Sequence, residues 1–70
     1  MFDYSKLLGK IKTCFKTQGN FAKEMGMSLS AVNSRLNNKI DWTPEEMIKA
    51  CELLFIPLEE IYLYFFVEKV

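Results

Sequence analysis

The stretch that decides the fold is TQGNFAKEMGMSLSAVNSRLNNK, residues 17 to 39. Phe21 and Met25 lie four residues apart, the spacing that places side chains on one face of a helix. Gly26 follows where helices commonly end in the left-handed conformation, and Ser28 can cap the start of a second helix. The stretch therefore predicts two short helices joined by a tight turn, a helix-turn-helix.

The second helix of this pair, from Leu29 to Asn37, has one apolar and one polar side. At 100° per residue, Val32 and Leu36 point inward, whereas the small polar side chains point outward. The outward set consists of Ser30, Ser34 and Asn37, with Asn33 and Arg35 on the flanks. Leu29 lies beside Val32, so it either covers the core or, at the first helical position, faces outward.

The flanking segments predict three more helices. Apolar residues step by three and four from Tyr4 to Phe15, which indicates an amphipathic first helix. Thr43-Pro44-Glu45-Glu46 is a strong helix start, in which Thr43 caps and Glu46 bonds back to the cap. A fifth helix is expected to run to about Tyr64. The fold class predicted is an all-α domain of five helices spanning residues 1–70.

The fourth helix carries an apolar stripe that ends before a proline. Its members recur at helical spacing and are Met47, Ile48, Cys51, Leu54 and Phe55. Ile56-Pro57 stops the helix, because the residue before proline avoids helical geometry. In the loop ahead of this helix, Ile40 and Trp42 are expected to plug the core; the alternative for Trp42 is a platform on which bases stack.

The charge of the chain is divided between its two halves. Residues 1 to 40 carry seven basic and two acidic side chains, a net charge of +5, and residues 41 to 70 carry two and seven, a net charge of −5. Such a dipole would turn the basic half toward a polyanion. The alternative is two solvated faces with no partner.

The last segment, IYLYFFV at residues 61 to 67, is apolar or aromatic at every position. A short helix on a small domain buries only one side, so part of this segment would be exposed in a monomer. We expect residues 58–70 to hold a homodimer together through Ile61, Tyr64, Phe65, Phe66 and Val67. The alternative is a strand or hook that folds back onto the same core.

The residues of the helix-turn-helix resemble a known family. The run Gln18, Ala22, Gly26, Ser28, Val32, Leu36, Asn37 and Lys39 is similar to the DNA-binding core of Cro-type phage repressors. The flanks FDYSKLLGKI, ACELLFIP and EEIYLYFF are similar to Cro-like regulators of phages of Gram-positive bacteria. Two departures are Asn38, where this xenobiotic-response-element-like family usually has glycine, and Leu29, where many relatives carry a polar or basic residue.

The resemblance implies a role in DNA binding for residues of the motif. Backbone contacts would come from the helix starts and the loop, and base contacts from the outward face of the second helix. The expected DNA-binding residues are Thr17, Gln18, Ser28, Leu29, Ser30, Asn33, Ser34, Arg35, Asn37, Asn38 and Lys39. The expected partner is a pseudo-palindromic double-stranded operator.

Other classes of function find little support in the sequence. There is no His, no serine with an activating base, no glycine-rich phosphate loop and no metal-ligand cluster, so we expect neither an enzyme, a cofactor nor a small-molecule ligand. No apolar run is long enough for a membrane span and no leader is evident, so a cytoplasmic location in a bacterial host is expected. Cys14 and Cys51 are expected to be buried and reduced, with a redox switch as the alternative.

The sequence thus predicts a homodimeric transcriptional repressor that acts by occupying operator DNA. The alternative belongs to another class: a protein-binding module, either an antirepressor or a partner subunit, that keeps the fold without reading DNA. Its support is the acidic second half and the small side chains on the outward face of the second helix. The operator sequence and the geometry of a dimer are left open.

Overall fold

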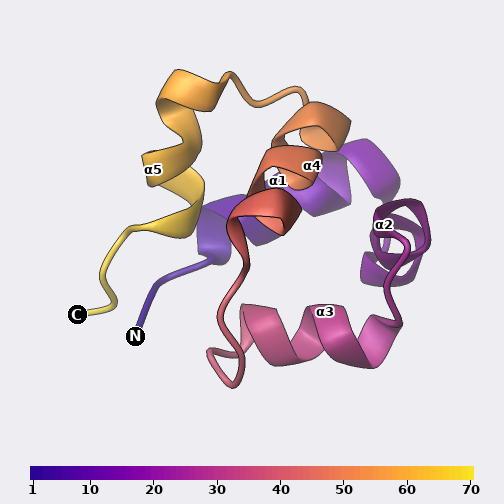
Figure 1. The fold of residues 1–70 in the computed structure, drawn as a ribbon, viewed down its shortest axis with the longest axis horizontal. Coiled ribbons are helices and arrows are strands. Elements are labelled where there is room, and N and C mark those ends of the chain that lie inside the picture. The colour runs from indigo at the N-terminus through magenta and orange to yellow at the C-terminus, as the bar shows by residue number, and fades with distance from the viewer.

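The computed structural model describes residues 1–70 and confirms the all-α prediction, as Figure 1 shows. The five helices, together with a short 3-10 turn ahead of the last one, are α1 (Ser5–Phe15), α2 (Gln18–Met25), α3 (Leu29–Leu36), α4 (Pro44–Leu54), η1 (Leu58–Glu60) and α5 (Ile61–Phe65). None of the helices is both long enough and apolar enough to cross a membrane.

Side-chain caps fix the starts of three helices where the sequence predicts them. The hydroxyl of Thr17 accepts a hydrogen bond from Asn20 N–H, and the hydroxyl of Ser28 accepts one from Ala31 N–H. Thr43 and Glu46 form the expected reciprocal capping box at the start of α4. Because these signals lie within four residues of one another, the sequence alone can locate the helix starts.

The core lies between α1, α2, α4 and α5, and α3 packs against α2 along the bottom of the molecule in the view of Figure 1. Leu7, Ile11, Phe21, Val32 and Phe65 are almost completely buried. Trp42 is buried as expected and packs edge-on against Phe65, with 5.5 Å between ring centroids. Ile40 departs from the prediction, because it is 49% exposed in the loop instead of plugging the core.

The two ends of the chain run side by side in opposite directions. Asp3 N–H donates to Val67 carbonyl at 2.7 Å, and Lys69 N–H donates to Met1 carbonyl at 2.9 Å. The two bonds flank an isolated bridge between Phe2 and Glu68. The tail after α5 therefore folds back along the N-terminal segment of its own chain, which is the course that the sequence left as an alternative.

Three residues of the predicted apolar faces are exposed: Cys14, Ile48, which is 44% exposed, and Phe55. Phe55 is not part of the buried stripe of α4: it follows the helix end and is 83% exposed. Cys14 is exposed, whereas Cys51 is buried, and both are free thiols. The expectation of a buried pair therefore holds for Cys51 only, whose pKa is raised by burial.

Candidate partner-binding surface

The helix-turn-helix forms as the sequence predicts. Gly26 ends α2 in the left-handed conformation, with φ of 72°, and Ser28 starts α3 two residues later. Val32 is fully buried on the inner side of α3. Ser28, Leu29 and Ser30 are exposed, and Leu29 is 47% exposed. The outward face of α3 is thus formed by small, uncharged side chains.

The cation of α3 is bound inside the protein. The Arg35 guanidinium donates from Nε to Glu46 Oε1 at 2.9 Å and from its second terminal nitrogen to Glu46 Oε2 at 3.1 Å. Its remaining terminal nitrogen donates to Ala31 carbonyl at 3.0 Å, and the side chain is only 15% exposed. This two-point contact ties α3 to the start of α4. The guanidinium of Arg35 is therefore occupied in this conformation, and a contact of Arg35 with phosphate or guanine stays a prediction.

The pKa of the Glu46 carboxyl reflects the same contact. Burial raises the pKa of this carboxyl, but hydrogen bonds from Arg35 and from the Thr43 N–H outweigh burial and leave its pKa below the usual value. The folded protein therefore stabilises the ionised form of Glu46. The Arg35–Glu46 pair is a structural link between two helices.

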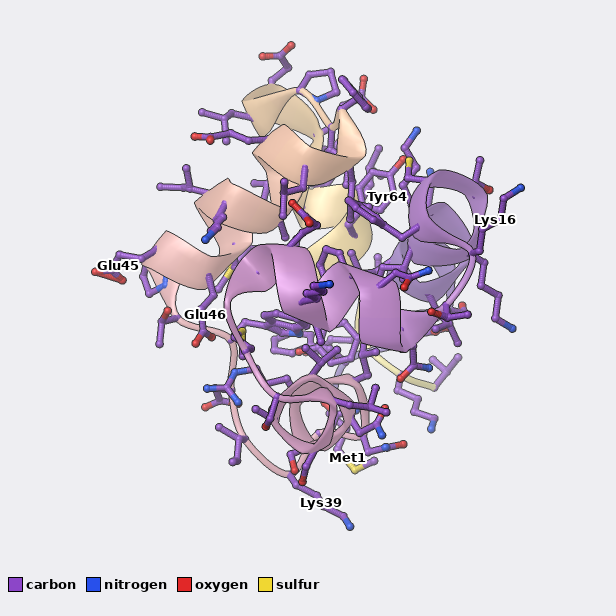
Figure 2. All side chains as sticks on the ribbon, turned by 90° about the vertical axis from the view of Figure 1, so that its right-hand side faces the viewer. Met1, Lys16, Lys39, Glu45, Glu46 and Tyr64 are labelled. Atoms are coloured by element: carbon purple, nitrogen blue, oxygen red, sulfur yellow. The ribbon has the colours of Figure 1, made fainter.

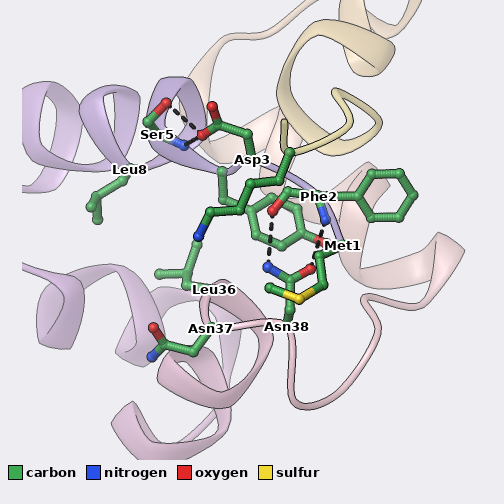
Figure 3. Close-up of a pocket in the computed structure, with 10 residues that line it drawn as sticks. Met1, Phe2, Asp3, Ser5, Leu8, Leu36, Asn37 and Asn38 are labelled. Atoms are coloured by element: carbon green, nitrogen blue, oxygen red, sulfur yellow. Dashed lines mark hydrogen bonds between the residues drawn. The ribbon is translucent and has the colours of Figure 1, made fainter.

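The asparagines at the end of α3 are also bound internally. Asn38 has φ of 62°, as predicted for a residue that replaces glycine. Its side-chain oxygen accepts from Phe2 N–H and its amide nitrogen donates to Phe2 carbonyl, both at 2.9 Å (Figure 3). Asn37 donates its side-chain amide to Asn33 carbonyl at 2.8 Å. The amide of Asn38 is thus fully engaged, whereas Asn37 is exposed; DNA contacts of Asn37 and Asn38 stay a prediction.

The other predicted DNA-binding residues offer little positive charge. Thr17 is occupied as the cap of α2, and Gln18, Asn33 and Ser34 are half-buried. Lys39 is exposed in the loop after α3, and Figure 2 shows it pointing away from the protein. With Arg35 paired, Lys39 is the single unpaired cation of α3 and the loop that follows it.

The residues proposed for dimerisation are divided between the core and the surface. Tyr64 and Phe65 are only 7% and 1% exposed, so their rings are packed within the single chain. Ile61 is half-buried, and Phe66 and Val67 remain exposed beside the folded-back tail. Self-association of the chain stays a prediction.

Two shallow hollows flank the N-terminal segment. One, of about 270 Å³, lies between that segment and the end of α3, and Figure 3 shows residues that line it. The other, of about 230 Å³, is lined by aromatic side chains that include Trp42, whose buried indole N–H has no hydrogen-bond partner. No group of His, Cys, Asp and Glu side chains is placed to hold a metal ion.

The connection from α4 to α5 forms an exposed apolar surface that the sequence analysis does not predict. Phe55, Leu58 and Tyr62 are 83%, 55% and 58% exposed in the connection from α4 to α5. Exposed glutamates accompany them in the same stretch of chain. The sequence signal for this surface is Phe55 itself. It occupies the position just after a helix, ahead of Ile56-Pro57, and glycine is common at such a position.

Comparison with known proteins identifies relatives of the whole chain. A model of one family, described as protein of unknown function (DUF739), matches residues 1–68. The solution structure of the modulator of repression (MOR) of the temperate bacteriophage TP901-1 from Lactococcus lactis is similar, with a TM-score of 0.84. The two chains are 45% identical, and the match covers 99% of this chain and 93% of that one. No curated protein matches the chain.

These findings correct two predictions. Membership of the Cro-type repressor family is wrong, because the matching family model and the similar phage protein are not Cro-type repressors. Repression by operator occupancy is contradicted as well, since the similar protein is a modulator of repression. The helix-turn-helix backbone is present, but backbone shape alone does not assign DNA binding. The chain belongs to the family described as protein of unknown function (DUF739).

Proposed function

We propose that this chain is a protein-binding regulatory module of a phage genetic switch. It contacts a transcriptional repressor and weakens the repressor's hold on operator DNA, as an antirepressor does. The observation that carries this proposal is the 45% identity to the TP901-1 modulator of repression over nearly the whole chain. This proposal agrees with the alternative drawn from the sequence, a protein-binding module that has the helix-turn-helix fold but does not read DNA.

The internal contacts of α3 support the proposal. A DNA-reading helix needs free donors for base edges and free cations for phosphates. Here the guanidinium of Arg35 is held by Glu46, and the amide of Asn38 is held by Phe2. Freeing Arg35 for DNA would leave the carboxylate of Glu46 half-buried without its partner. The helix-turn-helix is therefore better suited to a structural role than to reading bases.

The charge distribution also supports a protein partner that binds DNA. Residues 41 to 70, which form α4 and α5, carry a net charge of −5. Repressors carry positive charge to neutralise phosphates, so an acidic face attracts them and lowers their positive potential. Figure 2 shows Glu45 and Lys16 projecting from opposite sides, in agreement with a separation of charge.

The experiment uses the purified chain, the helix-turn-helix repressor encoded nearest to its gene, and a fluorescently labelled operator. Adding the chain to the repressor–operator complex should reduce the repressor's apparent affinity by about 10-fold or more. The chain alone should leave the anisotropy of the labelled DNA unchanged at near-physiological salt. No complex between chain and repressor, together with specific binding of the chain to the operator, would overturn the proposal.

A matched pair of variants separates protein contact from DNA contact. Ser30→Ala and Asn33→Ala remove polar groups of the outward face of α3 while keeping a helix-forming residue. Both variants should release the repressor as the parent chain does, because that face reads no bases in the proposed function. Loss of release in both would assign the function to α3. We expect no catalytic activity of the chain itself.

A further inference from the structure

Phe55 combines a left-handed backbone with an exposed aromatic side chain. Its φ of 57° and ψ of 39° place it in the left-handed region, where a bulky residue is an outlier. Its side chain is nevertheless 83% exposed, so no packing in the monomer compensates for the conformation. The fold itself gains nothing visible from a phenylalanine at this position.

The backbone role of this position does not need a side chain. The N–H groups of Phe55 and Ile56 both donate to the carbonyl of Cys51 and so close the end of α4. Glycine makes the same bonds without steric cost and is the residue most often found there. Because strained residues collect at functional sites, the conformation of Phe55 suggests a role for its ring outside the fold.

Two more exposed apolar side chains follow Phe55 in the connection from α4 to α5. Leu58 follows after Pro57 and is 55% exposed, and Tyr62 is 58% exposed one helical turn later. Leu58 and Tyr62 are four residues apart in the continuous helical segment formed by η1 and α5, so they lie on one side of it. We call Phe55, Leu58 and Tyr62 the α4–α5 corner.

Negative charge accompanies this corner along the chain, while α1 places the ammonium of Lys6 5.3 Å from the centre of the Tyr64 ring in α5. Glu52, Glu59 and Glu60 are exposed within the same stretch, and no Lys or Arg occurs between Lys49 and Lys69. The ammonium of Lys49 is directed elsewhere, since it donates to Met25 carbonyl at 3.3 Å. An apolar centre with an acidic rim is complementary to a partner with an apolar pocket and a basic rim.

The position of the corner keeps it apart from the helix-turn-helix. In Figure 1 the connection from α4 to η1 lies at the top of the molecule, whereas α3 lies at the bottom. The N and C termini lie at the lower left (Figure 1). The corner can therefore be occupied by a partner without disturbing the contacts that hold α3 and the N-terminal segment.

We propose that the α4–α5 corner is the surface that docks onto the repressor, with the ring of Phe55 inserted as the anchor into an apolar pocket on a positively charged face. This inference rests on the proposed function and adds the surface, the anchor residue and the chemistry of the partner. Aromatic anchors of this kind carry a large share of binding energy in protein interfaces. The strain at Phe55 is then retained because it holds the ring out in the solvent before binding.

The test compares binding and folding in the same variants. Phe55→Gly and Phe55→Asn both suit the left-handed backbone but remove the ring. Calorimetric titration onto the repressor should show at least about 30-fold weaker binding for both, as expected for an interface anchor. Their Tm should stay unchanged or rise by up to about 5 °C, because strain is relieved and little burial is lost. Phe55→Tyr, which keeps the ring, should bind within about 3-fold of the parent.

A matched control makes the same backbone change elsewhere. Lys16 also has a positive φ, of 73°, at the end of α1 and is exposed. Lys16→Gly should therefore relieve strain without affecting binding to the repressor.

If the parent binds and Phe55→Gly binds equally well, the corner is not the docking surface and the proposed function stands. If Phe55→Gly lowers Tm markedly, the ring is retained for packing. If the parent does not bind the repressor, both proposals fall.

Discussion

Asn38 shows how one side chain can replace a segment of backbone. Its amide both donates to and accepts from Phe2, in the manner of a neighbouring strand, while the tail bonds to the other edge of the N-terminal segment. The N-terminal segment is thus held between the end of α3 and the C-terminal tail. An asparagine at a positive φ costs some strain, and the two hydrogen bonds offset it.

Asn38→Gly should destabilise the protein although glycine suits its φ of 62°. The variant loses two hydrogen bonds, each worth about 1 kcal/mol, and regains part of this through relief of strain, so we expect a net loss of about 1 kcal/mol. Urea denaturation measures the loss, and hydrogen exchange of the Phe2 amide should become faster. Unchanged exchange at Phe2 would contradict the proposed clamp.

Glu46 should make the stability of the fold depend on acid pH. Its pKa is lowered in the folded protein relative to the usual value of 4.5, so its contribution is present above that value and is lost as pH falls through the folded pKa. Glu46→Gln should cost about 1 to 2 kcal/mol at pH 7, because the capping bond and the charge-assisted bonds to Arg35 both weaken. The gap between parent and variant should narrow below about pH 4.5.

Denaturation at pH 7, 5 and 3 tests this prediction. Glu45→Gln is the control, because Glu45 is exposed in the same first turn of α4 and lacks a bond to Arg35. It should lose only the favourable interaction with the helix dipole, about 0.5 kcal/mol. Equal losses for the two variants at every pH would show that the Arg35–Glu46 pair adds nothing to stability.

At the scale of helices, the sequence predicts what is decided locally. Thr17, Ser28 and Thr43 cap the helices they were expected to cap, and Gly26 ends α2 as expected. Each of these signals needs only neighbours within four residues. The end of α4 was predicted as well, but the exposure of Phe55 was not, because helical spacing does not show that a residue lies just beyond the last turn.

Two of the three glycines, Gly9 within α1 and Gly26 just after α2, should respond to alanine in opposite directions. Gly9 lies within α1 and a Cβ there would meet no atom within 4 Å, so Gly9→Ala should stabilise by about 1 kcal/mol through helix propensity. Gly26 has φ of +72°, so Gly26→Ala should destabilise by about 1 kcal/mol. Thermal denaturation should show Tm shifts of about 4 to 8 °C, upward for the first and downward for the second. Shifts of the same sign would contradict this account of the helix ends.

At the scale of the whole molecule, function depends on contacts that local patterns do not reveal. Arg35 and Glu46 are eleven residues apart, and Asn38 and Phe2 are thirty-six apart. The sequence placed Ser30 and Arg35 on an outward or flanking surface from helical geometry alone, which cannot show that a later helix supplies a carboxylate. Helical geometry alone therefore predicts a DNA reader, and it is the similarity to a modulator of repression that contradicts repression by operator occupancy.

The separation of charge leads to a prediction about rates of association. If the acidic rim of the α4–α5 corner steers the chain onto a basic repressor face, Glu59→Lys should slow association by about 5- to 10-fold at low salt and change dissociation little. The effect should largely disappear at about 0.5 M salt, where charges are screened over a few ångströms.

Glu24→Lys is the matched control, because it makes the same change in net charge on an exposed site of α2. Stopped-flow measurements should show less than about 2-fold slowing for this control. Equal slowing by both would mean that net charge, and not the corner, guides the encounter.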